Sequence, residues 1–214
     1  MKQGSTELVF ILDRSGSMTG LESDTIGGYN SMLEKQQKLD GECRITTVLF
    51  DDRYELLHDR IDIRAVSPID ATQYFVRGST ALLDAVGRTI HKIASAQQHT
   101  AAEYRADKVM VVIITDGYEN ASREYSLPAI KSLIEREKND YGWEFIFLGA
   151  NIDAIETAGQ FGISADRAQN YHADRQGTAV NFAAIGSAAA CLRTSGRMPE
   201  NWAAEVREDY ETRK

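Results

Sequence analysis

The 214-residue sequence predicts an α/β protein with a doubly wound, mostly parallel open sheet, helices on both faces and one antiparallel edge strand. Two observations support this fold class. Near-continuous apolar runs, typical of strands buried on both faces of a parallel sheet, alternate along the chain with segments of helical period. One further apolar run follows its predecessor too closely for a helical crossover, so these two runs are expected to pair as a hairpin.

Four apolar runs predict the parallel strands. They lie at 8–12, 46–50, 109–115 and 145–148. A run at 54–58 begins only three residues after the second strand, and we predict that it forms the antiparallel edge strand. A weaker strand is expected at 168–172.

The segments between the strands carry apolar side chains three or four positions apart, which gives each helix one stripe to pack on the sheet. The stripes are Ile26, Tyr29 and Leu33; Leu82 or Leu83, Val86, Ile90 and Ile93; and Leu127, Ile130 and Ile134. A short helix before 168–172 and an alanine-rich helix over about 178–192 complete the series. Gly27 and Gly28 each cost roughly 1 kcal/mol relative to alanine inside a helix. Either the first helix breaks there or a neighbour packs closely.

We expect one domain over residues 1–196, because a three-layer α/β unit commonly fills this length and no repeat or linker interrupts it. The composition changes only in the tail, 197–214, which is polar. Trp202, Val206 and Tyr210 recur there every four residues and predict a short amphipathic helix. This stripe either docks on its own domain, which we favour, or is offered to a partner.

The composition is that of a globular protein that needs no disulfide or structural metal, with 43% hydrophobic and 26% charged residues. The net charge of −8 argues against nucleic acid or an anionic membrane as the main partner. No stretch approaches the roughly 18 apolar residues of a membrane span, and the first apolar run is too short for a signal peptide. Cys43 and Cys191 lack metal or redox spacing, so we expect free thiols and a cytoplasmic location.

Oxygen-bearing side chains gather where two of the predicted strands end. Asp13, Ser15 and Ser17 follow the first strand at alternate positions, and Asp116 follows the strand at 109–115. If these two strands are neighbours, both carboxylates face one crevice at the carboxyl edge of the sheet, where ligands of open α/β sheets bind. Two unpaired carboxylates in a dry crevice would raise each other's pKa unless a cation lies between them.

The chemistry of these oxygens indicates which cation to expect. Hydroxyl and carboxylate ligands, with no histidine or cysteine in the motif, favour Mg²⁺, or Mn²⁺ or Ca²⁺, over zinc. Thr80 supplies a third hydroxyl where a loop becomes a helix. Taken alone, Ser79 and Thr80 are better explained as helix N-cap residues, and the pair Asp51 and Asp52 as a turn.

Together, these motifs resemble those of a von Willebrand factor type A domain. Asp13, Ser15 and Ser17 form its DxSxS, Thr80 ends a Gly-Ser-Thr before a helix, and Asp116 lies in a TDG after an apolar strand. The resemblance implies a Rossmann-like fold with a metal-ion-dependent adhesion site. In that site the three hydroxyls contact the metal and the two aspartates bind it directly or through water. The sixth coordination position is then open, and in the family a partner's Glu or Asp commonly fills it.

The resemblance covers roughly residues 6–195 and implies a non-enzymatic, stand-alone intracellular module that binds a protein partner's carboxylate through a divalent cation. The alternative is an Mg²⁺-dependent phosphotransferase of the haloacid dehalogenase type with Asp13 as the nucleophile. That family needs a second acid two residues later, where this chain has Ser15. A third possibility is a vestigial or structural site, with the interaction elsewhere.

The segment that follows Asp116 contains three residues that are also expected on the rim of the predicted site. Tyr118, Glu119 and Asn120 either set the choice of partner or form a solvated loop.

Overall fold

The computed structural model describes residues 4–213, so the first three residues of the predicted domain and the last residue of the predicted tail lie outside the described residues. One six-stranded sheet has the order β3-β2-β1-β4-β5-β6. The strands are β1 (Thr6–Asp13), β2 (Cys43–Phe50), β3 (Tyr54–Asp62), β4 (Lys108–Thr115), β5 (Glu144–Gly149) and β6 (Ala168–Asn170). Only the pairing of β2 with β3 is antiparallel within this sheet, which confirms the predicted mixed sheet and its edge strand.

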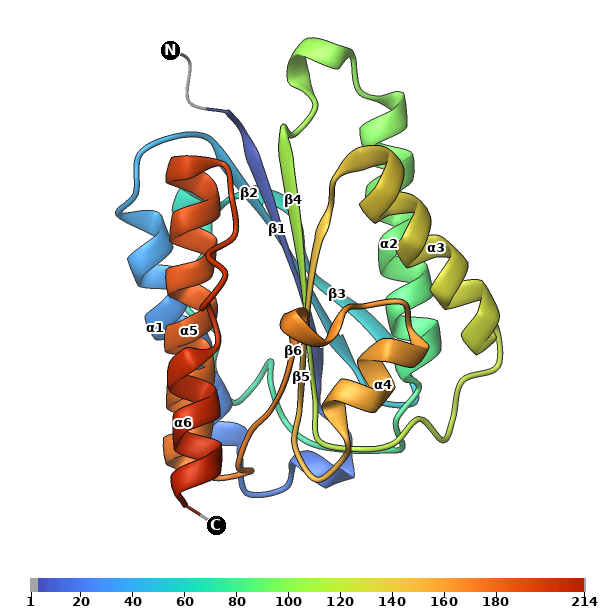
Figure 1. Ribbon diagram of the computed structural model, residues 1–214, viewed down its shortest axis with the longest axis vertical. Coiled ribbons are helices and arrows are strands. Elements are labelled where there is room, and N and C mark those ends of the chain that lie inside the picture. Colours follow the sequence, from blue (N-terminus) through green and yellow to red (C-terminus); the bar gives the residue numbers. More distant parts are fainter. Residues whose placement is uncertain (1–3, 214) are drawn as a thin grey trace.

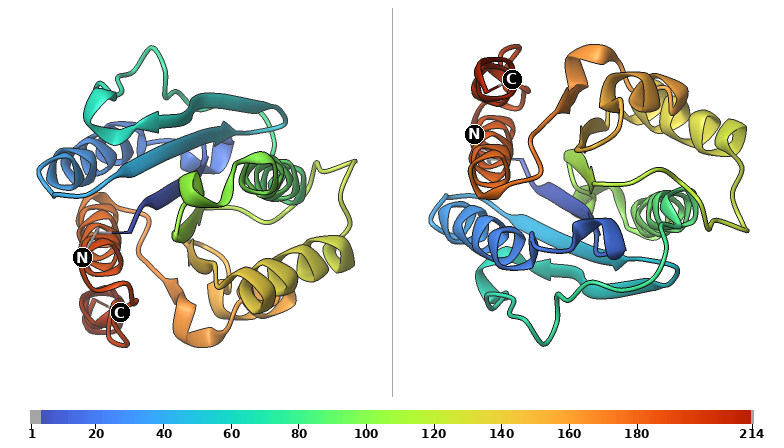
Figure 2. Two further views of the ribbon diagram at one scale, coloured as in Figure 1. Left: turned by 90° about the horizontal axis from the view of Figure 1, so that it is seen from above. Right: turned by 90° about the horizontal axis from the view of Figure 1, so that it is seen from below.

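Helices cover both faces of the sheet, as predicted (Figures 1 and 2). One face carries α1, α5 and α6, and the other carries α2, α3 and α4. The helices are α1 (Glu22–Gln37), α2 (Leu82–His99), α3 (Leu127–Tyr141), α4 (Ala154–Gln160), α5 (Arg175–Ser195) and α6 (Ala204–Thr212).

The central strand β1 contributes to the apolar core on each face. Leu8, Phe10 and Leu12 pack in the core beneath α1 and α5, whereas Val9 and Ile11 pack in the core beneath α2 and α3. Successive side chains of a strand point to opposite faces. The uninterrupted apolar run in the sequence therefore reflects burial on both sides.

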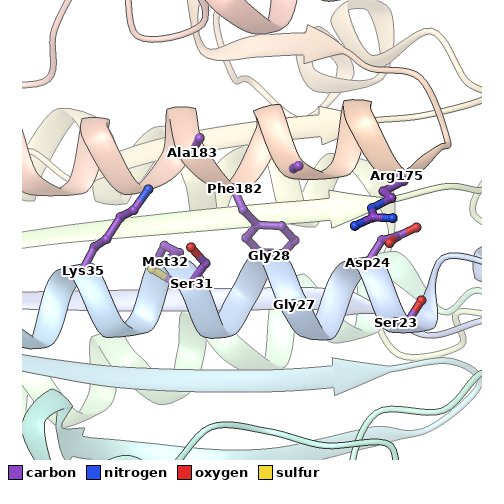
Figure 3. A pocket seen from close by; sticks show the side chains of 11 residues that line it. Ser23, Asp24, Gly27, Gly28, Ser31, Met32, Lys35, Arg175, Phe182 and Ala183 are labelled. Atoms are coloured by element: carbon purple, nitrogen blue, oxygen red, sulfur yellow. The ribbon is translucent and has the colours of Figure 1, made fainter.

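The glycine pair in α1 allows close helix packing, and α1 is unbroken. A Cβ atom at Gly28 would lie 2.3 Å from Cδ2 of Phe182, whose ring faces α1 from α5 (Figure 3). A Cβ atom at Gly27 would meet nothing within 4 Å. Of the two alternatives left by the sequence, the close neighbour is the one observed, and it accounts for Gly28 only.

The last two elements before the tail differ from their predicted bounds. Strand β6 ends at Asn170, two residues early, and α5 begins at Arg175, three residues before the predicted 178. The early start of α5 is explained by Asp174, whose Oδ1 accepts the N–H of Gly177 at 2.8 Å and thereby caps the first turn of the helix.

The tail helix α6 docks on its own domain. Trp202 and Val206 are buried in the same core as α5, and Trp202 Nε1 donates to the carbonyl of Asp166 at 2.8 Å. The ring of Tyr210 stacks on His172 with 4.8 Å between centroids. The domain boundary at 196 remains a prediction. Among residues 4–213, none of the helices is both long enough and apolar enough to cross a membrane.

The contrast between the two glycines of α1 can be tested by substitution. Gly28→Ala should lower the free energy of unfolding by about 1–3 kcal/mol, because the added methyl group must displace the buried ring of Phe182. Gly27→Ala is the matched control and should raise it by up to about 1 kcal/mol through helix propensity. Urea unfolding followed by circular dichroism measures both. Equal effects of the two substitutions would contradict this packing.

Candidate metal site

The structure brings the two predicted acids together at the carboxyl edge of the sheet. Strands β1 and β4 are parallel neighbours with Leu12 opposite Ile114, so both strands end at the same edge. The backbone N–H of Asp116 lies 3.4 Å from Oδ2 of Asp13 and donates to it. The strand adjacency on which the sequence argument depended is therefore confirmed.

The three predicted hydroxyl groups lie together beside these acids. Ser15 Oγ is 2.8 Å from Ser17 Oγ and 2.9 Å from Thr80 Oγ1. A single turn of 3-10 helix over Gly16–Met18 brings the two serines to one side. These separations are those of hydrogen bonds between hydroxyl groups, so the three oxygens form one hydrogen-bonded cluster. Hydroxyl oxygens gathered in this way could serve as ligands of a hard cation such as Mg²⁺.

Asp13 is fully buried and held by several donors. Its Oδ1 accepts the N–H of Ser15 at 2.7 Å, and its Oδ2 accepts the hydroxyl of Thr115 at 2.6 Å. Tyr74 donates to the carbonyl oxygen of Asp13 at 2.5 Å and fixes the backbone there. Burial raises the pKa of Asp13 more than these hydrogen bonds lower it. The carboxylate is thus rigidly placed in a position where a cation would stabilise its charge.

Asp116 has the same need for a cation. Burial above all, together with the charge of Asp13, raises its pKa to about 6, although a hydrogen bond from Asn151 Nδ2 opposes the shift. Asn151 has a φ of 53°, in the left-handed region that asparagine tolerates better than most residues. Sequence analysis missed Asn151, although a polar residue just after an apolar strand was a usable signal.

The loop that carries Thr80 is fixed by the segment after Asp116. The N–H of Thr80 donates to Asn120 Oδ1 at 2.9 Å, and the carbonyl of Thr80 accepts the N–H groups of Asn120 and Ala121. Glu119 accepts the N–H of Leu83 at 2.9 Å. Two of the three predicted rim residues therefore support the site, while Tyr118 is 65% exposed.

The first turn of α2 is capped from a distance, which leaves the Thr80 hydroxyl available. The N-cap residue is Ala81, so neither Ser79 nor Thr80 acts as the N-cap. Besides Glu119, Ser122 Oγ accepts an N–H of this turn, that of Asp84, at 3.0 Å. The Asp84 carboxylate in return accepts the N–H groups of residues 123–125.

A buried ion pair between Arg14 and Asp51 holds the DxSxS segment against the end of β2. Asp51 Oδ1 accepts the N–H of Arg53 at 2.7 Å, which confirms the predicted turn. Asp51 Oδ2 is 3.0 Å from Nε of the fully buried Arg14 and 2.6 Å from Nε of Arg77. Burial raises the pKa of Asp51, but the Arg77 hydrogen bond and these other contacts outweigh it and the net shift is downward. Sequence analysis missed Arg14, which lies inside the motif.

The backbone at Gly117 closes over the hydroxyl groups. A Cβ atom there would lie 2.9 Å from Ser17 Oγ and 3.2 Å from Thr80 Oγ1. Among the described residues, no cluster of three or more His, Cys, Asp or Glu side chains has metal-binding geometry. The groups that could hold a cation at this edge are two carboxylates and three neutral hydroxyls, a donor set suited to Mg²⁺.

Comparison with known proteins identifies the fold. No family model and no curated protein sequence matches the chain. Among solved structures, a von Willebrand factor type A protein from Catenulispora acidiphila superposes with a TM-score of 0.59 at 14% identity, over 87% of this chain and 43% of that one. Proximal thread matrix protein 1 from the mussel byssus, with a zinc-occupied MIDAS motif, has a TM-score of 0.59 at 16% identity, over 87% and 46%.

A third structure, the manganese-loaded TRAP protein of Plasmodium vivax, has a TM-score of 0.53 at 19% identity, over 70% of this chain and 58% of that one. The chain spans about half the length of these structures. Identities this low establish the fold alone, and that fold is the Rossmann-like fold of von Willebrand factor type A domains.

The raised pKa of Asp116 predicts how stability depends on pH without metal. The folded protein holds this proton more tightly than the unfolded chain, so stability should fall as the pH rises from about 4 to about 6. Asp116→Asn cannot ionise and still accepts from Asn151. In EDTA at pH 7.5 this variant should melt at a higher temperature than the wild type, and the difference should vanish near pH 4.

The control for this comparison is Asp140→Asn, which removes one exposed acid of α3 and should show no such pH-dependent difference. Thermal unfolding with and without Mg²⁺ completes the test, since Mg²⁺ should stabilise the wild type and leave Asp116→Asn unchanged. A lower melting temperature for Asp116→Asn in EDTA at pH 7.5 would contradict the argument.

Proposed function

We propose that the chain is a divalent-metal-dependent protein-interaction module. Its site consists of Asp13, Ser15, Ser17, Thr80 and Asp116, it takes Mg²⁺, and it binds an Asp or Glu carboxylate of a protein partner. The observation that carries the proposal is the hydroxyl cluster, spaced at 2.8 and 2.9 Å beside two buried acids.

The proposed roles of these residues follow from which side chains are charged and which are neutral. Asp13 and Asp116 together carry two negative charges, and the hydroxyls of Ser15, Ser17 and Thr80 carry none. A bound cation supplies the positive charge that a partner's carboxylate needs. The two carboxylates formally balance a divalent cation, but the three neutral hydroxyls donate less negative charge to it than further carboxylates would, so the ion keeps an affinity for an external acid at its open position.

Two similar structures support the metal, since one has zinc in its MIDAS motif and another is manganese-loaded. The preference for Mg²⁺ is our own and rests on the oxygen donors. An intracellular, cytoplasmic location, expected from the sequence, is part of the same proposal.

The phosphotransferase alternative gains no support from the site. The position that would hold its general acid is Ser15, whose Oγ lies with those of Ser17 and Thr80. A hydroxyl cannot act as a general acid at neutral pH. We therefore propose no catalytic role for Asp13.

Metal binding is best tested by substituting Thr80 and its neighbour Ser79, two hydroxyl residues of the same loop. Thr80→Ala should weaken Mg²⁺ binding at least about tenfold, because it removes one oxygen of the cluster. Ser79→Ala is the matched control, since Ser79 is exposed, and should leave the affinity unchanged. Isothermal titration with Mg²⁺ and with Mn²⁺ measures both. Equal affinities for the wild type and Thr80→Ala would exclude the hydroxyl cluster as the ligand set.

Partner binding is tested by capture from a lysate of the source organism. Immobilised wild type and Ser79→Ala should retain the same protein in Mg²⁺ and lose it in EDTA, whereas Thr80→Ala should not retain it. Substituting single acids of the captured protein should then identify the one that binds the site. A partner retained equally under all of these conditions would sink the metal-bridge mechanism and favour a structural role for the site.

A further inference from the structure

A hollow of about 350 Å³ lies directly beside the candidate metal site. It is bounded by the start of α2, the segment 117–119 and α4. Its apolar lining includes Leu83, Leu127, Ile152 and Phe161. Pockets for small molecules begin at about 300 Å³, so this hollow has room for one or two side chains.

The hollow and the metal site share a wall. Gly117 lines the hollow, and a Cβ atom added to it would lie 2.9 Å from Ser17 Oγ and 3.2 Å from Thr80 Oγ1. Leu82 and Leu83 also line the hollow and follow Thr80 almost directly in the chain. A peptide that places a carboxylate on the metal therefore has its neighbouring side chains within reach of the hollow.

The rim of the hollow is acidic. Asp153 is the N-cap residue of α4 and accepts the N–H of Glu156, in the first turn, at 2.9 Å. Both acids are exposed, and no ion pair involving either is present in the described part of the chain. Glu119 contributes a third carboxylate, which accepts backbone N–H groups. No lysine or arginine lines the hollow among the described residues. The charge of the rim thus complements a basic side chain.

We propose that the partner presents one short segment with three features: an acid for the metal, a neighbouring large apolar side chain for the hollow, and a lysine or arginine for the acidic rim. This inference rests on the proposed function, because the acid must first be held by the metal. In addition, contacts in the hollow, and not the metal alone, determine which partner sequences bind.

The probe is a library of random linear peptides displayed on phage, selected on the full chain in Mg²⁺ and eluted with EDTA. The eluted sequences should share an acid, an apolar residue within about two positions of it, and a basic residue. One such peptide is then synthesised with a fluorophore for anisotropy titration. Replacing its apolar residue by alanine should weaken binding about tenfold or more.

Variants of the protein test the hollow separately from the metal site. Thr157→Phe, on the α4 wall, should fill the hollow and weaken peptide binding about tenfold, while Mg²⁺ affinity stays unchanged. Glu156→Lys should weaken binding of the basic peptide about two- to fivefold. Glu205→Lys, an equal charge change on α6 at the other face, is its control.

The outcomes separate the two proposals. Peptides that share an EDTA-sensitive acid but no apolar residue, together with normal binding by Thr157→Phe, would overturn the role of the hollow and leave the metal-bridge function intact. If no peptide elutes with EDTA, or if Thr80→Ala selects the same peptides as the wild type, the proposed function and this inference both fail.

Discussion

The placement of two buried carboxylates side by side is the constraint on which the rest of the site depends. Asp13 and Asp116 lie at the ends of adjacent parallel strands, and burial disfavours the charge of both. The donors around them come from Ser15, Thr115 and Asn151 and hold each carboxylate in one orientation. Without a cation, the buried charges lower the stability of the folded protein. A bound cation would remove this cost, and local destabilisation of this kind is common at functional sites.

Much of this molecule could be predicted from sequence patterns. The strands were predictable because burial on both faces leaves an uninterrupted apolar run, as in β1. Asp13, Ser15, Ser17 and Asp116 were predictable as a group because short spacings and the parallel order of β1 and β4 bring them to one edge. Thr80, 65 positions from Ser15, joined them only through the resemblance to von Willebrand factor type A domains. The start of α5 was missed although its signal, the capping residue Asp174, is local in the sequence.

The contacts of the supporting residues could not be predicted, for a physical reason. Asn151, Glu119 and Arg14 each act through a partner 35 to 37 positions away along the chain. Such contacts arise only once the sheet has set which loops meet at its edge. Their side chains also have ordinary local explanations as turn or surface residues. Sequence reasoning thus identified the oxygen groups and missed what holds them.

The buried Arg14 has a consequence for how the DxSxS motif is to be understood. Pattern descriptions treat its second position as free, yet here Arg14 is wholly enclosed, and its guanidinium contacts Asp51 at 3.0 Å and Glu55 at 2.7 Å. A neutral residue at position 14 would leave Asp51 with one cation fewer in a dry setting, at a cost of several kcal/mol. Divergent copies of this chain should therefore exchange positions 14, 51 and 55 together. Grafting the motif with its arginine onto another scaffold would require an acid placed as Asp51 is here.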